Sequence, residues 1–418
     1  MKAFAVPTAC GAIAAALSLI FYGAFSRFYG DALLGWIIML IASMSLVQLG
    51  LVPQAWLYVV GAATDSELKK RFSVGVLAEV GGGLIGLCVL AALFSLPIEL
   101  LRNHGSEALL VFGGLWAAGS TSLQGLLRAR GKWRSFAAWV LIPNVVRILF
   151  VLTLPVAASV GKIPDLENHS VALVAIYFLV PDLIRYLVVN LAFLPRFFGF
   201  PSMEDFIRGL RGIWHNWLFD FGSAITESGD KILVGALVGP QLLVAYFFAR
   251  KIGAAVTIVI EPFYAEHYRR IVLCPVEQRT RRQITTYLQG VLLGVCVSLL
   301  GAGAVFVASR MPLASNYVPE AVQSNILIFC TILLIDSGIA ANRWSRYLSQ
   351  SGNRSLKLFI FRVTLFLTLG LSLILLRGLS GGLALALSFF LLWLLEIIFL
   401  SVMLRRKGLF HGRAPGSD

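Results

Sequence analysis

Residues 216–235 place charged side chains inside a stretch that is otherwise apolar enough to span a membrane. On a helix with about 100° per residue, the polar side chains form one stripe: Asn216, Asp220, Ser223, Glu227, Asp230 and Lys231. A charge at mid-membrane costs roughly 2.5–3.5 kcal/mol, so this stripe must avoid lipid. We expect it either to form a structural salt bridge with a neighbouring helix or to line a water-filled cavity.

Three further cations lie near the middle of predicted spans: Arg147, Arg250 and Lys251. No acid lies within one helical turn of any of them, so the partner of each must be on another helix or on a ligand. Cations at this depth in both halves of the chain suit an anionic cargo, such as a phosphate group. Acids at similar depth, Asp336 among them, would separate these cations when the site is empty or would bind a driving cation.

The remaining intramembrane charges have simpler interpretations. Asp182 and Arg185 are three residues apart and are expected to pair within one helix. Arg362 lies near a helix end, so its side chain is expected to extend to the membrane interface. Glu396 is expected near mid-membrane, and Glu79 nearer the cytoplasm.

The composition requires that membrane helices position these side chains. Hydrophobic residues make up 58% of the 418 residues and charged residues 13%, about half the charged fraction of soluble domains. Apolar runs of about 18 residues or more recur along the chain. About twelve spans are predicted, near residues 8–25, 33–61, 72–97, 107–127, 135–157, 170–194, 212–237, 240–264, 284–309, 321–345, 358–376 and 383–404. The glycines of "GGGLIG" (81–86) predict close helix packing.

The distribution of lysine and arginine predicts the orientation of these spans. The loops after even-numbered spans, together with the two termini, carry 24 basic residues, and the other loops carry five. This asymmetry places both termini in the cytoplasm. The basic loops also account for the formal charge of +14. We expect these loops to face anionic lipid, and they give no indication of nucleic-acid binding.

Several classes of function lack the residues that they need. The five cysteines form no CxxC pair and do not cluster with the five histidines, so we expect no metal site and no cofactor. No Walker A motif is present; "GLLRARGKW" (125–133) has the wrong spacing. The segment "MKAFAVPTACGAIAAALSL" is interpreted as the first span rather than as a signal peptide.

A polar break at residues 196–212 and a short internal sequence repeat indicate that the chain has two halves. "GDALLGW" (30–36) follows the first span, and "GPQLLVAY" (239–246) follows the seventh. We therefore predict an all-α polytopic membrane protein with two six-helix lobes, residues 1–196 and 197–418, around a central cavity.

This layout resembles the polysaccharide flippases (Wzx-type) of the MOP exporter superfamily, which share the fold of MATE transporters. The local match is "SGDKILVGALVGPQLLVAYFFARKIG" (228–253), with "FYGDALLGW" (28–36) similar to the corresponding turn of the first half. The resemblance implies ion-gradient-driven alternating access that moves an undecaprenyl-pyrophosphate-linked oligosaccharide from the cytoplasmic to the periplasmic leaflet of the bacterial inner membrane. Such transport serves surface polysaccharide, lipopolysaccharide or exopolysaccharide synthesis.

The resemblance also assigns roles and partners. Arg147, Lys231, Arg250 and Lys251 take the cationic role towards the pyrophosphate, and Asp220, Glu227, Asp230 and Asp336 are expected to line the cavity or to couple an ion. The partners implied are the lipid-linked oligosaccharide, membrane lipids, H⁺ or Na⁺ as coupling cation, and a polysaccharide polymerase or export complex.

Two alternatives stay open at this point. A cation-coupled multidrug antiporter of the same fold would suit the intramembrane acids, whereas the intramembrane cations argue against it. A membrane-embedded polysaccharide polymerase or ligase would need a catalytic periplasmic loop; the short loops around His104 and His169 hold one histidine each. We therefore expect a transporter and not an enzyme.

Overall fold

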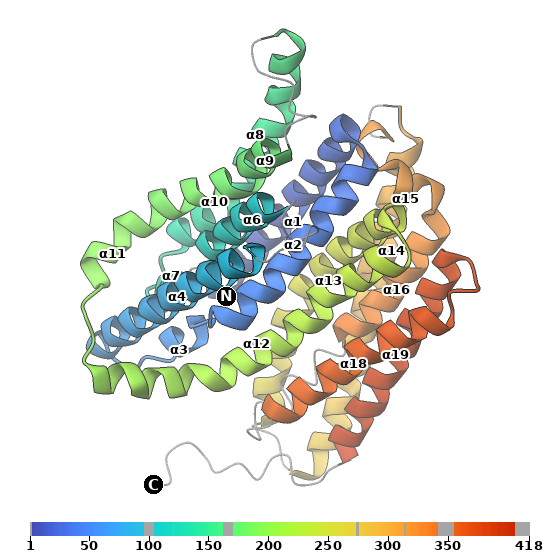
Figure 1. Ribbon diagram of the computed structural model, residues 1–418. Coiled ribbons are helices and arrows are strands. Elements are labelled where there is room, and N and C mark those ends of the chain that lie inside the picture. Colours follow the sequence, from blue (N-terminus) through green and yellow to red (C-terminus); the bar gives the residue numbers. More distant parts are fainter. Residues whose placement is uncertain are drawn as a thin grey trace. The chain divides into compact units, whose positions relative to one another are not determined.

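The computed structural model describes residues 2–95, 104–119, 121–161, 170–272, 276–312, 315–341 and 355–405, which are helical apart from short connections. The chain divides into two compact units, Met1–Ile232 and Leu233–Asp418. The predicted lobe boundary at residues 196 and 197 stays a prediction. Figure 1 shows the helices of both units.

The first unit begins with α1 (Lys2–Tyr29), α2 (Asp31–Leu51), α3 (Trp56–Val60), α4 (Asp65–Phe94), α6 (Gly105–Ala118), α7 (Thr121–Ala129) and α8 (Trp133–Ser159). A continuous run follows, made of α9 (Ser170–Val174), the π-helical turn η1 (Ala175–Leu179), α10 (Val180–Arg185), the π-helical turn η2 (Tyr186–Asn190) and α11 (Leu191–Phe197). The long helix α12 (Met203–Leu237) extends from the first unit into the second.

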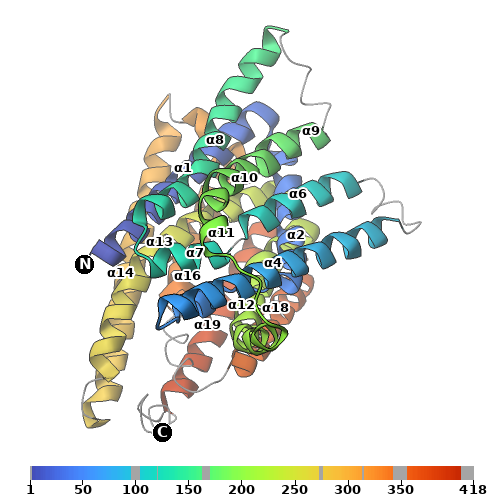
Figure 2. The same ribbon diagram turned by 90° about the vertical axis from the view of Figure 1, so that its left-hand side faces the viewer.

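The second unit contains α13 (Pro240–Val272), α14 (Val276–Arg310), the 3₁₀ turn η3 (Ser315–Tyr317), α15 (Glu320–Ser324), α16 (Ile326–Ala341), α18 (Ser355–Leu375) and α19 (Gly381–Arg405). Helix α16 packs against α13, α14 and α19. It is therefore the central helix of this unit, which fits its apolar sequence. Figure 2 shows the length of α14 beside α13 and α16.

Local sequence explains where several helices begin. The Thr64 hydroxyl accepts a hydrogen bond from the Glu67 N–H at 3.2 Å, and the Glu67 side chain accepts from the Ala63 N–H at 2.7 Å, which together cap α4. Gly239, with φ of 114°, makes the turn between α12 and α13. Pro240 then starts α13, where its missing N–H costs nothing.

Each predicted span coincides with a helix or a run of helices in the part of the chain that the structure describes. Three spans that were predicted as continuous helices are interrupted in the structure. The span at 321–345 is divided between α15 and α16 at Asn325. The span at 33–61 is divided between α2 and α3, and Pro53 lies in the break, where its ring disfavours helical backbone at the residue before it. The span at 107–127 is divided between α6 and α7 after Ala118.

Close packing at the α4 glycines is confirmed. A Cβ added at Gly82 would collide with the backbone of Leu51 and Val52, and one added at Gly86 would collide with the Phe112 ring. The missing side chains therefore let α4 approach the end of α2 and the face of α6.

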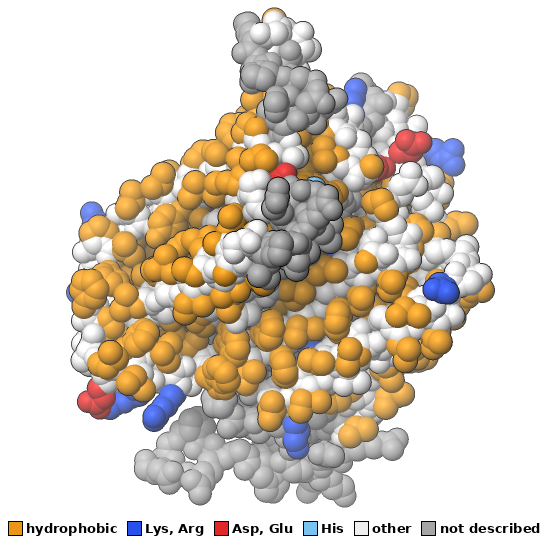
Figure 3. Space-filling model, viewed as in Figure 1, with side chains coloured by type: hydrophobic (Ala, Val, Ile, Leu, Met, Phe, Trp, Pro, Cys, Tyr) orange, Lys and Arg blue, Asp and Glu red, His pale blue; other side chains and the backbone are white. Residues whose placement is uncertain are grey.

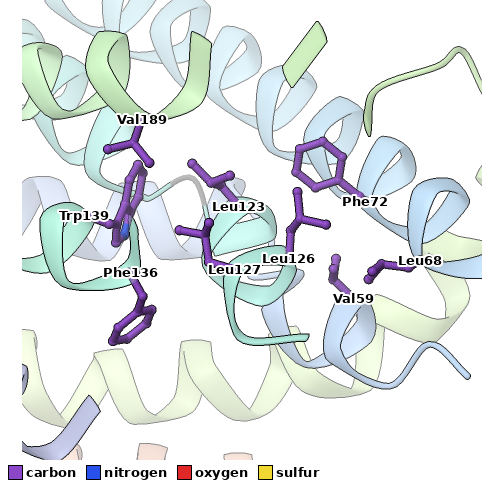
Figure 4. Packing of buried hydrophobic residues seen from close by; sticks show 9 residues of the cluster. All are labelled: Val59, Leu68, Phe72, Leu123, Leu126, Leu127, Phe136, Trp139 and Val189. Atoms are coloured by element: carbon purple, nitrogen blue, oxygen red, sulfur yellow. The ribbon is translucent and has the colours of Figure 1, made fainter. Parts of the chain in front are cut away.

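The base of the first unit is held by a cluster of buried apolar side chains from α3, α4, α7, α8 and η2. Its members are Val59, Leu68, Phe72, Leu123, Leu126, Leu127, Phe136, Trp139 and Val189 (Figure 4). Each is at most 5% exposed, so the short helices α3 and α7 are fixed by packing rather than by their own length.

Among the described residues, eight segments are long and apolar enough to cross a membrane: α1, α2, α4, α8, the run from α9 to α11, α14, α18 and α19. Large apolar side chains on these helices point outwards, for example Leu300, which is 74% exposed. Apolar side chains cover most of the face in Figure 3, and most of the charged side chains visible there lie near its margins. Such a surface matches lipid rather than water.

Candidate functional site

The mid-membrane cation Arg147 is paired across helices in the first unit. Its Nη2 donates to Asp182 Oδ2 of α10 at 2.5 Å, and its Nε donates to the Tyr177 carbonyl at 3.0 Å. Pro181, four residues after Tyr177, has no N–H to donate to that carbonyl. The expectation that the partner of Arg147 lies on another helix is confirmed.

Arg185 shares the same carboxylate. Its Nη2 lies 2.9 Å from Asp182 Oδ1, so the expected pair within α10 is present. The side chain is 9% exposed, and its guanidinium carbon lies 4.2 Å from the centre of the Trp139 ring. Its Nε has no hydrogen-bond partner among the described residues. Two guanidinium groups therefore share one carboxylate, which leaves a net positive charge.

These three residues line a cavity of about 430 Å³ inside the first unit. Two further polar side chains also line it, Asn144 of α8 and Gln124 of α7. The Trp139 ring forms part of the wall and supports Arg185. A buried guanidinium with an unused donor, beside an open volume, is able to bind an oxyanion through several N–H groups. We define the Arg147–Asp182–Arg185 group as the cationic cluster.

The second unit holds two of the predicted cations. Arg250 forms an ion pair with Asp336 of α16, so its partner also lies on another helix. The Asp336 carboxylate lies where a Cβ of Gly253 would be, and the glycine thus admits it against α13. The Lys251 ammonium lies 5.3 Å from the centre of the Phe247 ring.

The residues of the predicted polar stripe all lie on one helix, α12, and the members whose side chains are described differ in burial. Asp230 is 2% exposed and lies 3.4 Å from the ammonium of Lys231, which also contacts the Glu227 carbonyl. The Glu227 side chain is exposed and that of Asp220 is half-buried. The Asn216 side chain lies outside the described residues.

The cationic cluster brings together one predicted site residue, Arg147, with two that were not predicted as such. Asp182 and Arg185 were interpreted as a local pair because they are three residues apart. The sequence held a signal for them: Arg147 has no acid within one helical turn, and Asp182 is an acid at similar depth on another predicted span.

Another prediction was wrong. Arg362 does not extend to the membrane interface; its Nη1 donates to Glu396 of α19 at 2.7 Å. The pair is as buried as Arg147 and Asp182, with side chains 20% and 6% exposed against 19% and 6%. It is a structural ion pair of the second unit and a natural control for the cationic cluster.

Of the two histidines considered for catalysis, the structure describes only His104. The His104 ring lies 5.3 Å from the Trp36 ring, at the start of α6. His169 lies outside the described residues. Within the described parts of the chain, no three His, Cys, Asp or Glu side chains are grouped to hold a metal ion.

A scan against models of protein families found no match, and a search of curated protein sequences found none. Solved structures do match. An outward-facing multidrug resistance MATE family transporter of the MOP superfamily aligns over 97% of this chain and 96% of its own, with a TM-score of 0.61 and 12% identity. The MATE multidrug transporter DinF-BH aligns over 98% of this chain and 96% of its own, with a TM-score of 0.60 and 15% identity.

A MOP superfamily transporter from Pyrococcus furiosus Vc1 also aligns over 98% of this chain and 96% of its own, with a TM-score of 0.55 and 14% identity. Its published description reads "reverse polarity of binding pocket suggests different function". At such low identity the likeness concerns the fold alone. The chain is therefore an all-α, multi-span membrane protein with the fold of the MATE and MOP transporters over nearly its full length.

Proposed function

We propose that this protein is a transporter that works by alternating access and that its cargo carries an anionic phosphate group. The observation that carries the proposal is the cationic cluster facing a cavity of about 430 Å³. Solved structures of this fold include inward-facing and outward-facing forms, which is what a carrier needs in order to open to each side in turn.

The cargo that we favour is an undecaprenyl-pyrophosphate-linked oligosaccharide, moved from the cytoplasmic to the periplasmic leaflet of a bacterial inner membrane. A pyrophosphate offers several oxygens, and guanidinium groups bind such oxygens in pairs. Arg147 and Arg185 would hold it in the first unit; Lys231, Arg250 and Lys251 are further candidates. The basic loops favour cytoplasmic termini.

Energetics support an anion at this cavity. Two cations with one counter-charge are costly in a low-dielectric site, and an added anion would offset that cost. An organic cation entering the same cavity would increase the positive charge. The sign of the cavity thus favours the flippase over the multidrug antiporter.

The test is the leaflet distribution of lipid-linked oligosaccharide in cells that lack this gene. Radiolabelled undecaprenyl-linked sugars are extracted after exposure to a periplasmic glycan-modifying enzyme. We expect complete units to accumulate in a form that this enzyme cannot reach. Complementation with Arg147→Gln or Arg185→Gln should fail, whereas Arg362→Gln should restore export. Normal export without the gene would contradict the proposal.

The second candidate is a multidrug antiporter, favoured by the carboxyls buried in membrane helices and by the matched fold. It predicts that cells lacking the gene become sensitive to organic cations while glycan export stays normal. Measuring both phenotypes in the same strain separates the two functions.

A further inference from the structure

Glu79 of α4 is a buried carboxyl that the cationic cluster does not involve. The residue is 4% exposed, and no lysine or arginine in the described parts of the chain forms an ion pair with it. Its neighbours are neutral hydrogen-bond donors instead. A carboxyl in this setting is costly when ionised, so its presence calls for an explanation beyond packing.

Both helix breaks of the first unit meet at this carboxyl. Glu79 Oε1 accepts from the Thr121 hydroxyl at 2.5 Å and from the Ser122 N–H at 2.8 Å, both at the start of α7. The Thr121 oxygen in turn accepts from the Ala55 N–H at 2.9 Å, in the break before α3. Glu79 thus links α4 to two interrupted spans, and interrupted helices are typical of ion sites in transporters.

A spare polar atom lies at the same place. Ser122 is fully buried, its hydroxyl lies beside the Glu79 carboxyl, and its Oγ makes no well-formed hydrogen bond. A protonated carboxyl has one O–H to donate, and the Ser122 oxygen is an acceptor within the same pocket. The arrangement can therefore serve both the ionised and the neutral form of Glu79.

Two opposing effects act on the charge of Glu79. Burial opposes the ionised form, while the free N–H groups and the dipole at the start of α7 stabilise it. The carboxyl also lines a cavity of about 320 Å³, in which Tyr186 and Asn190 are the other polar side chains. The carboxyl therefore borders an open volume within the first unit.

The surrounding elements carry other titratable groups. Those of the elements that pack on α4 or border this cavity are Asp31 of α2, Tyr58 of α3, Glu107 of α6, Arg128 of α7, Tyr177 of η1, Asp182 and Arg185 of α10, Tyr186 of η2, Arg196 of α11, and Glu204, Asp205, Arg208, Arg211, Asp220, Glu227, Asp230 and Lys231 of α12. None of them, among the described contacts, forms an ion pair with Glu79.

We propose that Glu79 is the proton-binding site of the first unit and that its charge state controls the junction of α4, α3 and α7. The carboxylate holds the first turn of α7 and, through Thr121, the break before α3. Proton binding removes the charge and weakens both contacts, which frees the two interrupted spans to shift. That this shift drives cargo movement rests on the proposed transport function; proton binding itself does not.

The test is infrared difference spectroscopy of the full-length protein in proteoliposomes, stepped between acidic and alkaline buffer. A buried carboxyl that takes up a proton shows a C=O band, which moves when H₂O is replaced by D₂O. We expect this band in the wild type, its loss in Glu79→Gln, and its retention in Glu107→Gln. Glu107 is the control because it is also buried, at 3% exposure, and bonded to a serine hydroxyl.

A second variant keeps the test decisive if Glu79→Gln does not fold. Ser122→Ala retains the carboxyl but removes the adjacent hydroxyl, so the band should persist at a shifted frequency. A band that survives in Glu79→Gln, or that is unchanged in Ser122→Ala, would overturn the proposal. Loss of the wild-type band on adding sodium at constant pH would assign the site to sodium and overturn it as well.

This measurement uses no cargo, so its outcome is independent of the leaflet assay. Absence of the band together with failed glycan export in the gene deletion would refute only the proton site. Presence of the band together with normal export in the deletion would refute only the flippase function.

Discussion

Arg147 Nη2 lies 2.5 Å from Asp182 Oδ2, and the other oxygen of the same carboxylate lies 2.9 Å from Arg185. One acid thus restrains two cations that reach it from different helices. The same carboxylate, Asp182, is 6% exposed on its side chain, so water does little to screen this interaction.

Asp182→Asn should therefore destabilise the protein, because it leaves two buried guanidinium groups without their counter-charge. Removing one member of a buried ion pair costs about 3–5 kcal/mol. The measurement is thermal unfolding of the purified protein in detergent. Glu396→Gln is the control, since it breaks the equally buried pair with Arg362.

Inorganic pyrophosphate should change the unfolding temperatures of these two variants differently. It should raise the unfolding temperature of Asp182→Asn, because the anion replaces the missing carboxylate, and should leave that of Glu396→Gln unchanged. Equal shifts in both variants would mean that the anion does not bind at the cationic cluster.

Gly253→Ala should destabilise the second unit, because the new methyl group would displace the Asp336 carboxylate from α13. Overpacking of this kind costs about 1–3 kcal/mol. Gly303→Ala in α14 is the control: its Cβ would meet open space, so alanine should stabilise the helix by roughly 0.5–1 kcal/mol.

A double-mutant cycle identifies the cause. If the Asp336 carboxylate is what the methyl group displaces, Gly253→Ala should cost much less in an Asp336→Ala background. Additive effects of the two substitutions would place the strain elsewhere.

The sequence predicts much of the fold because apolar run length and charge placement are local properties. Within the described residues, all twelve spans coincide with helices, and the absence of acids near Arg147 and Arg250 correctly placed their partners on other helices. The partners themselves, Asp182 and Asp336, are 35 and 86 residues away, and only tertiary packing selects them from the other intramembrane acids.

The helix breaks illustrate the limit of such reasoning. Helix α6 ends at Ala118 and α7 begins at Thr121, within an apolar run that has no proline to mark the break. Hydropathy measures compatibility with lipid and not the continuity of a helix. For this reason α2 and α3 were predicted as one long span, and so were α6 and α7. The role of Glu79 was hidden for the same reason, since its partners are supplied by those breaks.

Two adjacent glycines of α4 provide a test of the packing near Glu79. Gly82→Ala should cost about 1–3 kcal/mol, since its Cβ would collide with backbone atoms of Leu51 and Val52 that cannot rotate away. Gly81→Ala should be neutral or stabilising, because its Cβ would meet nothing within 4 Å. Thermal unfolding of the two variants gives the comparison, and equal stability of both would contradict the close approach of α2 to α4.

Cysteine labelling distinguishes the two acids of α12 that lie three residues apart. Glu227 is exposed and Asp230 is 2% exposed. With the native cysteines replaced, Glu227→Cys should react readily with a membrane-impermeant maleimide in detergent, because its thiol reaches water and can ionise. Asp230→Cys should react much more slowly, because its thiol is shielded beside Lys231.

Unfolding in denaturant should make the two labelling rates equal, which would show that folding rather than local sequence sets the difference. Comparable rates in the folded protein would mean that both acids face water, and the interpretation of this stripe as a cavity wall would then extend to Asp230.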